Sequence, residues 1–279
     1  MQYIVSYFAR NQYEYPVTDA LLDFLVVPAL TTDQRVVRRV LHTVPSASIH
    51  SYTNLFGFET LRVRPVTPFT VCEFRFEFWV NRFISPYQDP DVLLPEAQRQ
   101  QLQADEVRIG QALYLQPTDY TYLSQDARWE WTPGQPAAGY LRSLNTYIHQ
   151  SLRFEPGSTH VHTTADEAWQ QKSGVCQDYA HIFLALARRQ GIPCRYVSGF
   201  LHPGPDHQGT AVMHAWVEAW IPGYGWMGLD PTNNILTDET FIKVAHGCDY
   251  QDCPPIKGVI NTTGGQATRY EVAVSRAGQ

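Results

Sequence analysis

The segment Ser173-Gly-Val-Cys-Gln-Asp-Tyr-Ala180 decides the fold of this chain, because it places a cysteine where a helix begins. Apolar residues recur at helical spacing from Cys176 to Ala187 and form one face. Gly191-Ile-Pro193 ends the run, as a glycine followed by a proline does after a last helical turn. The pattern predicts a helix with Cys176 in its first turn.

Cys176 is a candidate nucleophile because of this position. The unpaired N–H groups and the positive end of the helix dipole favour the thiolate form of a cysteine there. The backbone N–H of the same residue can also point at a developing oxyanion. The alternative is a small core residue on the apolar face, and for a lone cysteine the two readings are equally good.

A second pattern follows downstream, with the features of a β-hairpin. Met213-His-Ala-Trp-Val-Glu-Ala-Trp220 alternates as a strand, a Pro-Gly-Tyr-Gly turn follows, and the chain returns to Asp230. Counting outward from the turn puts His214 and Asp230 nearly opposite, with Cβ atoms about 5 Å apart. A His–Asp hydrogen bond of this kind orients a general base. The alternative is a structural histidine beside a turn aspartate. It would explain His214 or Asp230 alone, but it explains less well why both occur downstream of a cysteine at a helix start.

Composition excludes several classes of function. The 279 residues are 44% hydrophobic and 17% charged, with a net charge of −6 and no Lys/Arg-rich run. We therefore expect no nucleic-acid partner. No apolar run is long enough to span a membrane, and the N-terminus lacks the pattern of a secretion signal. A cytoplasmic location is the expectation, and five sparse cysteines argue against a disulfide framework.

Three units are expected along the chain. Residues 1–85 predict an all-β domain, since residues 71–80 alternate with period two and residues 54–60 resemble a hairpin turn. The proline-ended segments at residues 13–17 and 24–28 are typical of edge strands. Residues 86–134 form a helical linker with a helix over 94–115. Residues 135–279 form the catalytic core, with helices over 139–152 and from a capping box at Thr164 and Glu167, and a C-terminal strand.

Four ordered motifs in this core resemble the bacterial transglutaminase-like cysteine enzyme family over roughly residues 135 to 247. They are Gly174-Val-Cys-Gln-Asp-Tyr-Ala180, Arg188-Arg-Gln-Gly-Ile-Pro-Cys-Arg-Tyr-Val-Ser-Gly199, His214-Ala-Trp-Val-Glu218 and Gly228-Leu-Asp-Pro-Thr232. That family uses a Cys–His–Asp triad in this chain order, and the matching positions are Cys176, His214 and Asp230. The N-terminal part also resembles the β domain that precedes this core in bacterial members.

The resemblance implies an α+β fold with a papain-like, transglutaminase-like core. In it, the helix bearing the cysteine packs on an antiparallel sheet, preceded by a small all-β sandwich or barrel. It also implies acyl transfer from amide or peptide bonds of a protein or peptide substrate through a thioester. A hydrolase, either a protease or an amidase, is the favoured reading. The alternatives are a protein-glutamine transglutaminase with an amine acceptor and a non-catalytic binding module, against which the intact triad argues.

No cofactor and no metal are expected. Many cross-linking members of the family use calcium, but the sequence has no EF-hand-like loop. The histidines at 160, 162, 202 and 207 and the group of His246, Cys248 and Cys253 lack zinc-ligand spacing.

Four further residues are candidates for the oxyanion site or the cleft. Trp169 and Gln170 lie shortly before the nucleophile and could supply a second oxyanion donor, or they could be packing and surface residues of a short helix. Gln177 and Asp178 follow the nucleophile and could line the cleft, or they could simply suit the helix dipole.

Overall fold

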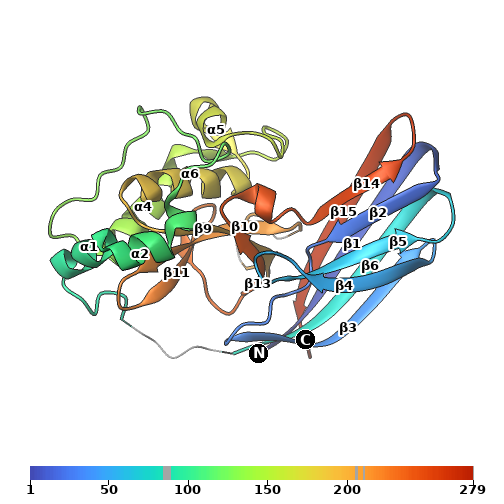
Figure 1. Ribbon diagram of the computed structural model, residues 1–279, viewed down its shortest axis with the longest axis horizontal. Helices are drawn as coiled ribbons and strands as arrows, with labels where there is room; N and C mark the ends of the chain where they lie inside the picture. The colour runs from blue at the N-terminus through green and yellow to red at the C-terminus, as the bar shows by residue number, and fades with distance from the viewer. Residues whose placement is uncertain (84–88, 205–206, 210, 279) are drawn as a thin grey trace.

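The computed structural model describes residues 1–83, 89–204, 207–209 and 211–278, and it has a β-sandwich beside a mixed α/β core (Figure 1). The expected α+β class with an all-β part is therefore confirmed. One continuous cluster of buried hydrophobic side chains runs through both parts, which fixes them against each other.

Two four-stranded antiparallel sheets form the sandwich. Their strand orders are β15-β1-β6-β3 and β14-β2-β5-β4. The strands are β1 (Gln2–Val17), β2 (Asp19–Phe24), β3 (Gln34–Val44), β4 (Ala47–Thr53), β5 (Glu59–Pro65), β6 (Phe69–Arg82), β14 (Ile256–Asn261) and β15 (Gln266–Arg276). The alternation predicted in β6 buries Phe74 and Phe76 between the sheets, where both rings pack against Phe24. The predicted turn after residue 53 joins β4 to β5.

The predicted core unit of residues 135–279 is wrong at its C-terminal end. The C-terminal strands β14 and β15 belong to the sandwich and not to the core. β15 pairs with β1 from Tyr3↔Arg276 to Tyr13↔Gln266, and β14 pairs with β2. The reason is that β15 and β14 supply main-chain partners for β1 and β2, whose hydrogen-bonding edges would otherwise stay open. Both ends of the chain thus build the sandwich.

The edge-strand expectation for the proline-ended segments is also wrong. β1 and β2 each have a neighbour on both sides, and of residues 24–28 only Phe24 belongs to β2. Pro16 lies inside β1, where the register with β6 shifts between Gln12 and Val17. A proline is tolerated there because an irregular stretch of the ladder does not use its missing N–H.

The core is a five-stranded antiparallel sheet of order β12-β11-β10-β9-β13, covered by helices. Its strands are β9 (Cys194–Leu201), β10 (His214–Ile221), β11 (Gly225–Asp230), β12 (Ile235–Leu236) and β13 (Phe241–Gly247). The main helices are α4 (Ala137–Ser151), α5 (Ala165–Gln171) and α6 (Cys176–Arg189). Short elements complete it: β7 (Arg153–Phe154) and β8 (Ser173–Gly174), which pair in parallel, and the 3-10 helix η1 (Tyr250–Asp252).

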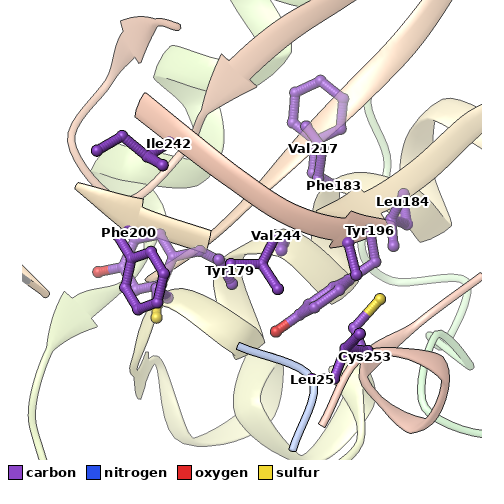
Figure 2. Close-up of a cluster of buried hydrophobic side chains, with 14 of the residues drawn as sticks. Leu25, Tyr179, Phe183, Leu184, Tyr196, Phe200, Val217, Ile242, Val244 and Cys253 are labelled. Carbon is purple, nitrogen blue, oxygen red and sulfur yellow. The ribbon is translucent and has the colours of Figure 1, made fainter. Parts of the chain in front are cut away.

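Helix α6 lies against β9 and β10 and is buried on almost every side, not on one face as predicted. Figure 2 shows Phe183 and Leu184 of this helix among Tyr196, Val217 and other side chains of the sheet. Each fully buried side chain of this size contributes roughly 2 kcal/mol to folding. The helix is enclosed because α4 and α5 pack on the sides that the sheet leaves free. Its N-terminus is therefore held firmly.

The region predicted as one helix over 94–115 contains three short helices, α1 (Pro95–Gln103), α2 (Asp105–Gly110) and α3 (Ala112–Leu115). The first break occurs at Ala104, whose backbone is extended. Helices α4 and α5 confirm their predictions, including the capping box between Thr164 and Glu167. None of the helices in the described ranges has the length and apolar character needed to cross a membrane.

Candidate active site

Cys176 is the first residue of α6 and is 8% exposed. The preceding residue, Val175, is extended, and its N–H donates to the Asp178 carboxylate at 2.7 Å. Thr159 donates to the same carboxylate oxygen at 2.7 Å. These bonds cap the helix and fix the turn that presents the thiol.

His214 and Asp230 come from the neighbouring strands β10 and β11. The register pairs Val217 with Leu229, so its continuation puts Asp230 across from Trp216, two residues from the predicted position. Positions two apart on a strand share a face, so the two side chains still meet. His214 Nε2 lies 2.7 Å from Asp230 Oδ2, and both side chains are fully buried.

The Asp230 carboxylate is held by further donors. The backbone N–H groups of Thr232 and Asn233 donate to Oδ1 at 2.9 and 3.3 Å, and the Asn233 side-chain amide donates to Oδ2 at 2.7 Å. Burial works to raise the pKa of Asp230, but His214 and the Asn233 donors outweigh it and lower the pKa. Asp230 therefore stays ionised beside the imidazole.

The other ring nitrogen of His214, Nδ1, is buried and has no hydrogen-bond partner among the described residues. Burial alone would lower the pKa of His214, but the charge and hydrogen bond of Asp230, followed by those of Cys176, raise it to about 10. The arrangement thus favours an imidazolium beside the Asp230 carboxylate.

A loop segment covers this nitrogen. Gly209 has a φ of +78°, and a Cβ at this position would lie 2.6 Å from Nδ1 of His214. Only glycine fits such a close approach with that backbone conformation. Asn233 ties the segment in place, since its Oδ1 accepts from the N–H of Gln208 at 2.7 Å.

A cleft of about 760 Å³ opens onto these residues, between the core and the sandwich. Cys176, Gln177 and His214 lie on its core side. The sandwich side carries Tyr7 of β1 and Tyr270 of β15. The β domain therefore forms one wall of the candidate active site.

The other predicted cleft residues have different positions. Gln177 lies on the cleft wall, and its amide donates to the Val161 carbonyl at 3.2 Å. Asp178 instead caps the helix, and burial raises its pKa. Trp169 is buried against Tyr147, and Gln170 points to Asp126. Neither residue lines the cleft, because each side chain on α5 contacts a residue outside it, Tyr147 for Trp169 and Asp126 for Gln170.

Sequence reasoning missed Asn233, Gly209 and the tyrosines of the cleft. Asn233 had a readable signal, since an Asn three residues after a strand-end Asp can reach back to it. Gly209 and Tyr270 gave none, because their roles depend on contacts between segments far apart in the chain. No group of three or more His, Cys, Asp or Glu able to hold a metal occurs in the described ranges, and all five cysteines are free thiols.

The fold and this site define a cysteine enzyme of the transglutaminase type, and the comparisons agree. Residues 131–231 match the Transglutaminase-like superfamily. The chain is 32% identical over 273 residues to the uncharacterized protein ML0607 of Mycobacterium leprae, covering 94% of this chain and 93% of that one. It belongs to the bacterial transglutaminase-like family.

Two other similarities are informative. A protein-glutamine gamma-glutamyltransferase of Pseudomonas aeruginosa is 33% identical over 114 residues, which cover 37% of this chain and 17% of that enzyme. The crystal structure of a candidate cysteine protease from Cytophaga hutchinsonii matches with a TM-score of 0.78 at 21% identity, covering 100% of this chain and 91% of that one. The latter likeness concerns the fold alone and extends over the sandwich as well as the core.

Proposed function

We propose that this protein is a cysteine hydrolase that cleaves an amide or peptide bond through a thioester on Cys176. The observation that carries the proposal is the buried His214–Asp230 pair in the wall of the cleft that Cys176 also lines, with Cys176 among the groups that raise the pKa of His214. This is the relation of nucleophile, base and orienting carboxylate that activated cysteines need.

In the first half of the proposed reaction, the Cys176 thiolate attacks the substrate carbonyl carbon. The carbonyl oxygen becomes an oxyanion that faces the first N–H groups of α6, which lack intrahelical acceptors. When the C–N bond breaks, the imidazolium of His214 gives its Nδ1 proton to the leaving amine. The acyl group is then a thioester on Cys176, and His214 is neutral.

In the second half, water attacks the thioester carbon and loses a proton to His214. The C–S bond breaks, the acid product leaves, and the thiolate–imidazolium pair is restored. Throughout, Asp230 holds the imidazole in one tautomer and stabilises its charged form. General acid–base catalysis of this type contributes about 10²–10⁴ in rate.

A transglutaminase is the second candidate, because the chain is 33% identical over 114 residues to the Pseudomonas protein-glutamine gamma-glutamyltransferase. The family match over residues 131–231 includes Cys176, His214 and Asp230. In a transglutaminase a primary amine replaces water as the acyl acceptor. The thiol chemistry is the same in both cases, so the acceptor must be determined by experiment.

The test of the shared chemistry is alkylation by iodoacetamide from pH 5 to 9, with each modified cysteine located by peptide mass mapping. Cys176 should react faster than the partly exposed Cys248, which serves as the internal control. His214→Ala should slow alkylation of Cys176 near neutral pH by about tenfold or more and leave Cys248 unchanged. Equal rates at the two cysteines, with no effect of the substitution, would contradict the proposal.

The acceptor is decided by supplying casein together with a fluorescent primary amine. Hydrolysis predicts new peptide or carboxyl products with little incorporated label, and transglutamination predicts label in casein in excess of hydrolysis. Cys176→Ala should abolish either product.

A further inference from the structure

We infer that the cleft takes its substrate as an extended polypeptide that adds a strand to the free edge of β15. This inference rests on the proposed function and names the substrate class of the same site. It concerns the wall contributed by the sandwich and not the triad.

β15 is the terminal strand of its sheet, with β1 as its one neighbour. Two backbone bonds fix which groups face β1: Ala277 N–H donates to the Gln2 carbonyl, and Glu14 N–H donates to the Gly265 carbonyl. Odd-numbered residues of β15 therefore pair with β1. In an antiparallel ladder the even-numbered residues must then direct their N–H and C=O groups outward.

One outward group is already engaged by the core. Val272 N–H donates to the Ala211 carbonyl at 2.9 Å, and Ala211 lies on the chain segment that leads into β10 and His214. The edge therefore accepts a main-chain partner immediately beside the candidate active site.

The next two outward positions along the strand are Tyr270 and Thr268, and both lie on the cleft wall. Among the described residues, no backbone partner faces these groups beyond the ladder with β1. Their spacing of two residues, about 6.8 Å, matches the repeat of another extended backbone. A small amide substrate cannot satisfy two such positions at once, whereas a peptide strand can.

The side chains around this edge also suit a peptide. Tyr7, Tyr250 and Tyr270 all line the cleft. In an added strand, alternate side chains would point toward this aromatic wall, and the intervening ones would point away from it. The site therefore favours a substrate with an apolar or aromatic residue near the bond that is cleaved.

Binding is tested with fluorescein-labelled casein, an unfolded polypeptide that offers many sequences, by fluorescence anisotropy in the Cys176→Ala background. Tyr270→Pro removes an outward N–H and puts a ring in the path of an added strand, while the ladder with β1 keeps its bonds. We expect its dissociation constant to rise about tenfold over that of Tyr270→Ala, which controls for the side chain. Gln266→Pro, at an outward position of β15 outside the cleft, should leave binding unchanged.

Thermal unfolding followed by circular dichroism checks each variant, and Thr268→Pro replaces Tyr270→Pro if the latter is unfolded. Equal binding by the proline and alanine variants, or no casein binding by the Cys176→Ala parent, overturns the inference. Hydrolysis of p-nitrophenyl acetate with Cys176 intact reports the thiol chemistry separately. If that activity is absent and the proline effect persists, the proposed function fails and the edge assignment stands.

Discussion

The core sheet holds two acid–base clusters that differ in their burial and in what lies beside them. Asp230 pairs with His214 at one end of β10, and Glu218 pairs with Lys243 and Arg195 farther along the same strand. Asp230 is fully buried and the Glu218 side chain is 16% exposed, and in both cases charged partners outweigh the effect of desolvation and lower the carboxyl pKa. By their pKa shifts alone the two clusters are alike.

They differ in what lies beside them. Glu218 accepts from two cations at 2.6 Å, and Arg195 also reaches His246 and stacks on Trp226. The His214–Asp230 pair instead shares the wall of its cleft with the thiol of Cys176. A perturbed pKa therefore marks both sites, and the nucleophile in the same cleft distinguishes the one suited to chemistry.

The sharpest test of this difference exchanges the two carboxylates for amides. Glu218→Gln leaves the partly buried Arg195 and Lys243 without an anion, so we expect the free energy of unfolding to fall by about 1.5–3 kcal/mol. Urea denaturation at pH 7 measures it. The rate per folded molecule should stay within about twofold of wild type, because the cluster does not touch the cleft.

Asp230→Asn is the matched variant and should show the reverse pattern. It removes the group that orients and charges His214, so we expect the hydrolytic rate to fall on the order of 10³-fold. The stability loss should be smaller than for Glu218→Gln, because a histidine can lose its charge and an arginine cannot. If both variants lost activity equally per folded molecule, the distinction between the two clusters would be wrong.

The same contrast explains how far the sequence could predict this structure. The helix start at Cys176, the hairpin and the shared face of His214 and Asp230 depend on local periodicity, and sequence patterns report that well. The pairing of β15 with β1 and the departures of Trp169 and Gln170 from the cleft depend on which distant surfaces meet. Neither hydropathy nor spacing specifies those contacts, because many pairings bury the same residues.

A second prediction concerns stability as a function of pH. The pKa of His214 is raised from 6.5 to about 10 in the folded protein, by Asp230 and Cys176 against the effect of burial. Its contribution is therefore complete below pH 6.5 and is lost as pH rises toward 10. The pKa of Glu218 is lowered from 4.5 to about 2, so its contribution is lost only as pH falls below 4.5.

Between pH 6.5 and 9.5 the contribution of His214 should be lost, whereas Glu218 stays ionised in the folded and the unfolded protein. We expect the wild type to lose on the order of 3–4 kcal/mol more than His214→Gln over this interval. Urea denaturation of both proteins at several pH values measures the difference. Parallel curves for the two proteins would mean that the His214–Asp230 pair holds no extra proton in the folded state.

The smallest expected effect concerns Asn233, which supports the His214–Asp230 pair by a hydrogen bond to the Asp230 carboxylate. Asn233 donates to Asp230 and bonds the main chain of Gln208, and so links the carboxylate to the segment over the imidazole. A hydrogen bond to a charged group contributes about 1.5–3 kcal/mol, so Asn233→Ala should lower kcat about tenfold. Little change in KM is expected, because the amide does not line the cleft.

Asn234→Gly is the control, since Asn234 bonds Asn145 and Thr146 instead and its φ of +55° suits glycine. A purely structural role for Asn233 would lower stability and leave the pH profile of kcat in place. A positioning role predicts a shifted profile, because Asp230 would hold the imidazolium less well once it loses this donor. Asn233→Asp should shift that profile further still, since a second carboxylate beside Asp230 makes it harder for both to stay ionised.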